Sequence, residues 1–150
     1  MNTSSEDQLR KIMETFGYGY VGSFSEGLAI VLKGEECFHI RLDGQLAYQE
    51  RYDHVGPFRE GLAWAKKDGK EFHIRHDGQP AYRERYDYVY SFSEGLACVQ
   101  KDGKWFHIRP DGQPAYEERY DLVGSFSEGL AWVRKDGEDF HIRPDGTRVD

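Results

Sequence analysis

Hydrophobic and polar positions recur along the chain with a period of 34 residues. The hexapeptide that begins at Phe24 reads Phe-Ser-Glu-Gly-Leu-Ala, and three copies follow at this interval, one with Arg in place of Ser: they begin at Phe58, Phe92 and Phe126. A second segment, Phe-His-Ile-Arg, keeps the interval and begins at Phe38, Phe72, Phe106 and Phe140. Repetition at one fixed interval is typical of proteins built from stacked copies of one structural unit. We therefore divide the chain into four units: 18–51, 52–85, 86–119 and 120–150.

Turn residues within each unit predict antiparallel β-hairpins. In unit three the pair Asp102–Gly103 separates two runs of β-forming residues, and Asp-Gly supplies the positive φ angles of a type I′ turn. A second turn, Arg109–Gln113, combines Pro and Gly. Such a short unit has no room for a crossover helix, so the predicted class is all-β. The expected extended segments of unit three are 86–89, 96–100, 104–109 and 114–118.

Two of these strands differ in their alternation. The strand after each Glu-Gly pair is apolar on both sides, which predicts that both of its faces are covered. In the Phe-His-Ile-Arg strand, Phe and Ile face one way and His and Arg the other in all four units. That alternation predicts a half-buried strand with an exposed polar face.

Residues 1–17 predict an amphipathic helix outside the repeats. Two capping-box patterns, Thr3-x-x-Glu6 and Ser5-x-x-Gln8, mark its start, and Gly17 is a natural stop. Its apolar residues follow the spacing of one helical face: Leu9, Ile12, Met13 and Phe16. Because the end of a repeat array needs covering, we expect this helix to cap unit one. A helix that docks a partner is the alternative.

The two ends of the array differ, which favours an open, solenoid-like array over a closed small propeller. Unit four ends at Asp150, short of the segment that closes the other units, and the helix occupies the other end. Propeller blades are usually longer than these units, and four blades is the lower limit.

Composition narrows the class of partner. The net charge of −7 argues against a nucleic-acid backbone and against docking on anionic lipid. The amino-terminal segment lacks the basic start and apolar run of a signal peptide, so we expect a cytoplasmic protein. Cys37 and Cys98 occupy non-equivalent positions of the repeat, and we expect both to be free thiols.

The unit resembles the WG repeat, a short β-rich repeat of bacterial proteins. The resemblance rests on Tyr-Asp, then Phe-Ser-Glu-Gly-Leu-Ala-x-Val, then Gly-Lys-Trp and a second Gly turn, and it covers about residues 18–150. One departure is consistent, because the Gly of the namesake Trp-Gly pair is Phe in every unit and only Trp105 keeps the Trp. The pairs are Cys37–Phe38, Glu71–Phe72, Trp105–Phe106 and Asp139–Phe140. The resemblance implies a divergent, all-β member of the family and brings no catalytic residues.

The repeated polar residues suggest little catalytic chemistry. Four histidines occur in register, and each is followed two residues later by an Arg on the same strand face: His39, His73, His107 and His141. They could ring a metal ion only in a closed propeller. The neighbouring Arg cations disfavour such a metal site. The Glu of the hexapeptide could accept bonds from those Arg or His side chains, but we favour backbone amides at its own turn. The segment Gly22–Gly27 fails the spacing of a nucleophile elbow. We expect no enzyme activity, no cofactor and no bound metal.

The preferred function is a non-catalytic scaffold that binds a protein or peptide, since stacked units offer an extended surface. The predicted binding residues lie on the polar face of the Phe-His-Ile-Arg strands, with a Trp beside Arg as anchor. They are His73, Arg75, Trp105, His107 and Arg109. The alternatives are a structural spacer or assembly unit and, less favoured, a metal or small-molecule binder that uses the His, Arg and Glu rows.

Overall fold

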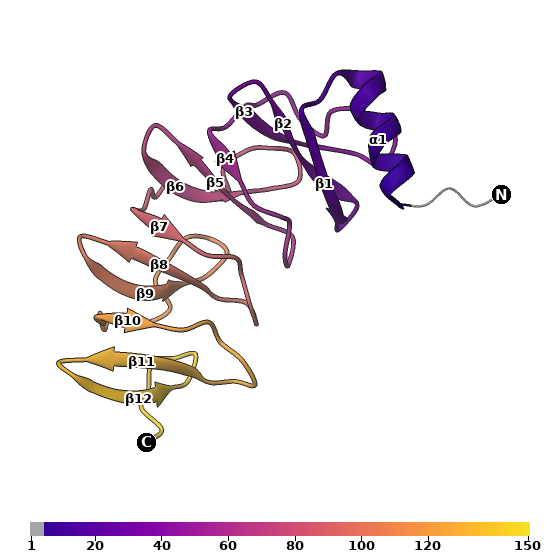
Figure 1. The fold of residues 1–150 in the computed structure, drawn as a ribbon. Coiled ribbons are helices and arrows are strands. Elements are labelled where there is room, and N and C mark those ends of the chain that lie inside the picture. Colours follow the sequence, from indigo (N-terminus) through magenta and orange to yellow (C-terminus); the bar gives the residue numbers. More distant parts are fainter. Residues whose placement is uncertain (1–4) are drawn as a thin grey trace.

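The computed structural model describes residues 5–150 and has one helix followed by four three-stranded antiparallel sheets. Helix α1 covers Ser5–Phe16, and each unit supplies one sheet (Figure 1). This confirms the predicted all-β repeat. The strands are β1 (Tyr20–Ser25), β2 (Leu28–Lys33), β3 (Glu36–Ile40), β4 (His54–Val55), β5 (Ala63–Lys67), β6 (Lys70–Ile74), β7 (Tyr88–Val89), β8 (Ala97–Lys101), β9 (Lys104–Ile108), β10 (Leu122–Val123), β11 (Ala131–Lys135) and β12 (Glu138–Ile142).

Two tight turns in each unit have residues at positive φ, and in units two to four both turns place a non-glycine residue there. Asp102 has φ of 53° and Gly103 of 79°, as the type I′ turn between β8 and β9 requires. The Glu-Gly turn before β8 has the same form, because Glu94 has φ of 54° and Gly95 of 83°. The left-handed region is unfavourable for a residue with a Cβ, so the Glu must be held there by other contacts.

Those contacts come from the neighbouring unit. The carboxylate of Glu60 accepts the backbone amides of Glu94 at 2.7 Å and Gly95 at 2.8 Å, both in the Glu-Gly turn of unit three. Glu26 reaches Gly61 of unit two and Glu94 reaches the turn of unit four in the same way. We call this row the glutamate ladder. The sequence predicted bonds at each residue's own turn, and the structure shows bonds to the next one.

The β3, β6 and β9 strands are covered on both faces, contrary to the half-buried prediction. Phe106, His107 and Ile108 are all buried, because the face that carries His107 packs against unit four. Residues 114–118 form no strand and contribute only the isolated bridge between Ile108 and Pro114. The sheets therefore have three strands each.

The Phe that replaces the family Gly has a defined packing role. In unit three the edge of the Tyr86 ring packs against Phe106, with centroids 6.0 Å apart, and the Arg119 guanidinium lies 3.8 Å over its face. Units one and two repeat this Tyr–Phe–Arg stack. A Gly there would remove the centre of the stack.

Helix α1 caps unit one, as expected. Its apolar face packs on the core through Leu9, Ile12, Met13 and Phe16. A Cβ on Gly44 would lie 2.3 Å from the Phe16 ring, just as a Cβ on Gly78 would lie 2.4 Å from Tyr48 of the preceding unit. Phe16 thus stands in for the tyrosine of a preceding unit. Thr3 of the first capping box lies outside the described residues.

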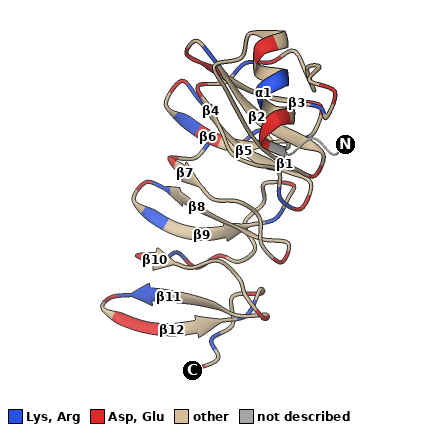
Figure 2. Cartoon of the chain, turned by 45° about the vertical axis from the view of Figure 1, so that its right-hand side comes forward, with Lys and Arg blue, Asp and Glu red and all other residues tan. Residues whose placement is uncertain are grey.

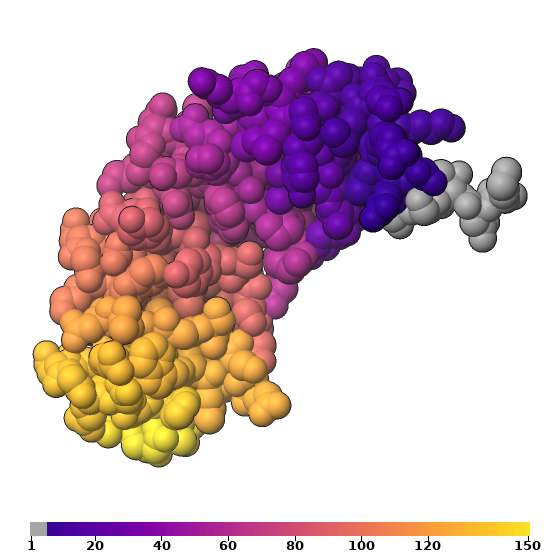
Figure 3. Space-filling model, in the orientation of Figure 1, coloured from indigo at the N-terminus to yellow at the C-terminus, as the bar shows by residue number. Residues whose placement is uncertain are grey.

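The four sheets form an open, curved array whose two ends do not meet (Figures 1 and 3). The predicted open array is therefore confirmed. The Glu-Gly turns before β8 and β11 lie on its concave side and the Asp-Gly hairpin tips on its convex side. Charges of both signs are interspersed along the chain (Figure 2). Among residues 5–150, no helix has the length and apolarity needed to cross a bilayer.

Candidate functional site

Three of the four register histidines are fully buried between units. In unit three, His107 Nδ1 lies 2.5 Å from the hydroxyl of Tyr116, and Nε2 lies 2.8 Å from the carbonyl oxygen of Gly124 in unit four. A carbonyl only accepts, so Nε2 donates to it and Nδ1 accepts from the tyrosine. The equivalent triads are His39–Tyr48–Gly56 and His73–Tyr82–Tyr90.

Burial keeps these side chains neutral. It lowers the pKa of His39, His73 and His107 to about 4, against a partly opposing effect of the bond to the carbonyl. Burial likewise raises the pKa of the three tyrosines. Both ring nitrogens are used, so each His joins two units and has none left for a metal or a substrate.

The five predicted binding residues do not form one surface. His73 and His107 are buried, so the prediction that they face a partner is wrong. Arg75 and Arg109 are exposed where β6 and β9 end, and both begin the Pro/Gly-type turn that follows. Trp105 lies at the opposite end of β9 from Arg109, about 13 Å away at the rise of an extended strand.

Trp105 belongs instead to an aromatic cluster that the sequence did not predict. Its ring stacks on Tyr88 of β7, with centroids 6.3 Å apart and planes 17° apart, and contacts Tyr90 at 5.6 Å. Trp105 and Tyr88 flank Gln100, which pairs with both across the sheet. The two tyrosines are each 53% exposed. We call Tyr88, Tyr90 and Trp105 the aromatic cluster.

The cluster occurs in unit three alone. The positions equivalent to Tyr90 are Gly in the other units: Gly22, Gly56 and Gly124. In unit two the space over Gly56 is filled by Trp64, whose Nε1 would lie 2.0 Å from an added Cβ. Unit three reverses this arrangement, because the small, buried Cys98 stands at the Trp64 position and the large Tyr90 ring projects outward. Comparing the units column by column would have revealed this exchange.

A groove runs beside the cluster across the junctions of units two, three and four. It has a volume of about 520 Å³, and its lining includes Trp64, Tyr90 and Arg59 together with serine side chains: Ser91, Ser93 and Ser125. At the equivalent position of units one and three a serine hydroxyl bonds the next unit's Phe carbonyl, as Ser93 does to Phe126 at 2.9 Å. In unit two that position is Arg59, whose guanidinium turns back to Ser25. The junction of units two and three therefore lacks this hydroxyl bridge.

The described residues offer little for metal or nucleophilic chemistry. Within residues 5–150, no three His, Cys, Asp or Glu side chains are grouped as ligands of one metal ion. Cys37 and Cys98 are buried and form no disulfide, as expected, and burial raises the pKa of Cys98 to about 11. A thiol so protonated is a weak nucleophile.

Solved structures similar to this chain are β-propellers. Hsv2 of Kluyveromyces lactis, with loop 6CD replaced by a Gly-Ser linker, matches 89% of this chain with a TM-score of 0.59 and 11% identity. Hsv2 of Kluyveromyces marxianus matches 89% with a TM-score of 0.56 and 11% identity. This chain covers 52% and 49% of those two chains, about half their length. At this identity the likeness is one of fold: the open array curves like part of a propeller.

The sequence comparisons identify the repeat itself. No curated protein matches the chain. The family model described as the WG containing repeat matches four segments, which together exceed half of the sequence: 10–37, 40–70, 83–105 and 108–138. The order of turns, the strand pattern and the Tyr–Phe–Arg stack recur within this framework. The chain belongs to the WG containing repeat family.

Proposed function

We propose that the protein is a non-catalytic repeat scaffold that binds a protein or peptide partner through the aromatic cluster of unit three. The observation that carries this proposal is the exposure of Tyr88 and Tyr90 beside Trp105, because no other unit carries all three aromatic residues at the equivalent positions. Exposed Tyr and Trp rings supply large contact area at low entropic cost and are enriched at interface anchors. The adjoining groove adds the Arg59 guanidinium and serine hydroxyls as polar contacts.

Packing alone does not account for the cluster. Val89 and Val99 on the other side of the sheet are buried and fill the core, whereas the cluster rings lie on the outer rim of their face. Stacked aromatic rings in water gain only about 1 kcal/mol from each other. A partner that covered them would gain the burial of their apolar area as well.

The test is affinity capture from a bacterial lysate with matched variants. Tyr88→Ala/Trp105→Ala removes the centre of the cluster, and Tyr20→Ala is the control because Tyr20 holds the equivalent position in unit one and is also 53% exposed. We expect specific partners to be captured by the wild type and by Tyr20→Ala and lost with the double variant. A folded double variant that retains every partner would refute this surface. If wild type captures none, the spacer function is favoured.

A further inference from the structure

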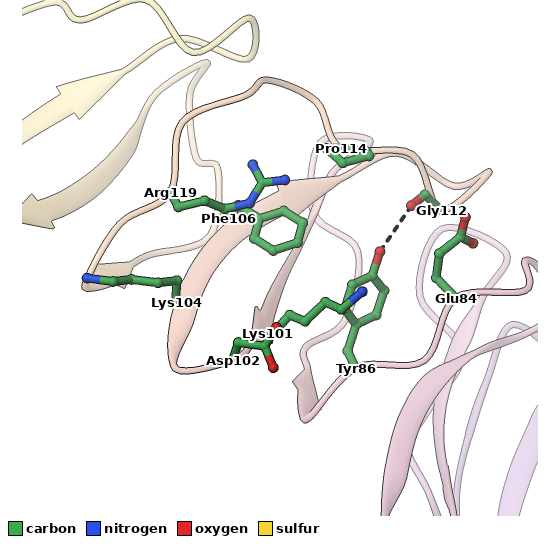
Figure 4. Close-up of a pocket in the computed structure, with 9 residues that line it drawn as sticks. All are labelled: Glu84, Tyr86, Lys101, Asp102, Lys104, Phe106, Gly112, Pro114 and Arg119. Atoms are coloured by element: carbon green, nitrogen blue, oxygen red, sulfur yellow. Dashed lines mark hydrogen bonds between the residues drawn. The ribbon is translucent and has the colours of Figure 1, made fainter.

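A second feature of unit three lies on the face of its sheet opposite the aromatic cluster. A cavity of about 370 Å³ opens beside Phe106, which alternates with Trp105 along β9 and so faces the other way. Tyr86 and Phe106 form its aromatic wall, and Lys101 and Arg119 add cations (Figure 4). We call it the cation–aromatic pocket.

Arg119 presents an unused donor edge at this pocket. Its Nη1 donates to three backbone carbonyls, those of Tyr116, Glu117 and Glu118, at 2.8–3.2 Å. These bonds and the Phe106 ring fix the guanidinium plane. Within residues 5–150, its Nε and Nη2 donate to no acceptor. A fixed guanidinium with two free donors is suited to a carboxylate, which accepts two parallel bonds.

Lys101 is the second cation of the pocket, and it forms no close ion pair with a described residue, although its charge helps to lower the pKa of Asp87. In the described chain no carboxylate lies within 4.0 Å of its ammonium, whereas Lys104 is held 2.6 Å from Asp121. Two acidic residues also line the pocket, but they lie at its edges: Glu84 beside Gly112 and Asp102 at the hairpin tip (Figure 4). The centre is left to Lys101, Arg119 and the aromatic rings.

The residues that line the pocket recur in unit two. All nine lining positions carry the same residue types there, including Lys67 for Lys101 and Arg85 for Arg119. The contacts of the arginine are also the same, because Arg85 lies 4.0 Å over Phe72 and its Nη1 donates to three carbonyls. The outer units break the set: Glu36 and Glu138 stand where units two and three have Lys70 and Lys104.

We propose that the pocket of unit three and the equivalent residues of unit two together bind carboxylate side chains of one extended acidic peptide segment. Two sets of the same cationic and aromatic residues one unit apart favour an extended ligand with repeated negative charge. The fixed guanidinium favours carboxylates as the negatively charged groups of this ligand. This inference goes beyond the proposed function, since it uses neither the cluster nor the groove, and either can fail alone.

The first experiment uses a fluorescent octaglutamate peptide, with octaglutamine as the neutral probe, in anisotropy titrations of the full chain. Lys67→Glu/Lys101→Glu alters both sets of residues. Lys33→Glu/Lys135→Glu is the matched control, since these lysines hold the same hairpin position in units one and four and the change in net charge is the same. We expect the pocket variant to lose about tenfold or more in octaglutamate affinity and the control to stay within about twofold. Equal losses in both variants, or octaglutamate binding no tighter than octaglutamine, would overturn the proposal.

The second experiment tests whether one peptide spans both sets of residues. A peptide with a single Glu between Gly and Ser residues engages one set at a time, so Lys67→Glu alone should weaken it by about twofold. The same variant should cost octaglutamate much more, because linked contacts gain from effective concentration. Equal losses for the two peptides would refute simultaneous occupancy.

Discussion

At the scale of the residue, the buried histidines tie the stability of the protein to pH. The pKa of His39, His73 and His107 is about 4 in the folded chain and about 6.5 when unfolded. Between these values the unfolded chain binds protons that the folded chain excludes. Their contribution to stability is therefore complete above pH 6.5 and is lost as the pH falls toward 4.

We predict that the free energy of unfolding falls by roughly 4 kcal/mol per pH unit between pH 5.5 and 5, up to about 1.4 for each buried histidine. His73→Gln should reduce this slope by about a third. His54→Gln, on an exposed side chain of β4, should leave it unchanged. Urea unfolding at successive pH values measures the slope, and equal slopes for both variants would contradict the assignment.

The glutamate ladder makes a second prediction at this scale. Glu60 is held at φ of 51° and bonds two amides of the next unit, whereas the Glu128 carboxylate, at φ of 53°, accepts no bond from any described residue. Glu128→Gly should relieve backbone strain and raise stability by up to about 1 kcal/mol. Glu60→Gly gains the same relief but loses two charged hydrogen bonds, so it should lower stability by about 1 kcal/mol. Thermal melts compare the two variants. Equal shifts in melting temperature would mean that the bonds of the glutamate ladder do not contribute to stability.

At the scale of the element, the loop after each third strand is held by a ring of the preceding unit. Gly69 and Gly78 both have positive φ, of 79° and 83°. A Cβ on Gly69 meets nothing within 4 Å, and one on Gly78 meets the Tyr48 ring at 2.4 Å.

We predict that Gly69→Ala costs about 1 kcal/mol, which is the backbone strain alone. Gly78→Ala should cost at least about 2 kcal/mol more, because overpacking adds to the strain. Chemical denaturation of both variants measures the difference. Equal costs would mean that the ring moves aside freely.

The sequence predicted where the hairpins lie better than it predicted which strand faces are buried. The Asp-Gly pairs predicted the hairpin turns, because positive φ is a local requirement that few residues meet. We predicted that His107 lies on an exposed face, because a polar residue in an alternating strand faces solvent when one side of the sheet is open. The bonds to Tyr116 and Gly124 that allow its burial join residues 9 and 17 positions away, and no local pattern reveals them. The aromatic cluster was missed for the same reason, since Tyr88 and Trp105 meet across a strand.

At the scale of the whole molecule, the two ends of the array are finished differently. Helix α1 covers unit one, whereas nothing in the described chain covers the outer face of unit four. Asp150 stands where the other units have the tyrosine, and it bonds His141, which is only partly buried, at 3.1 Å. Phe140 is only half-buried, although its equivalents are buried.

We predict that amide hydrogens of β12 exchange faster with solvent than those of β9, the strand that holds the equivalent position in unit three. The exchange free energy of β12 should lie several kcal/mol below that of β9, because no unit of the described chain packs on the outer face of unit four. Hydrogen–deuterium exchange with mass spectrometry measures both segments. Equal protection would indicate that the array opens only as a whole.

The glutamate ladder gives the array a direction. At all three junctions the glutamate of one unit bonds backbone amides of the next, so each junction repeats the same ladder contact between two unlike surfaces. A duplication that inserts one more unit between two others creates junctions of the kind already present. A deletion of one unit brings its two neighbours together in a junction of the same kind. The length of the surface can thus change in a single genetic event without any new contact having to evolve.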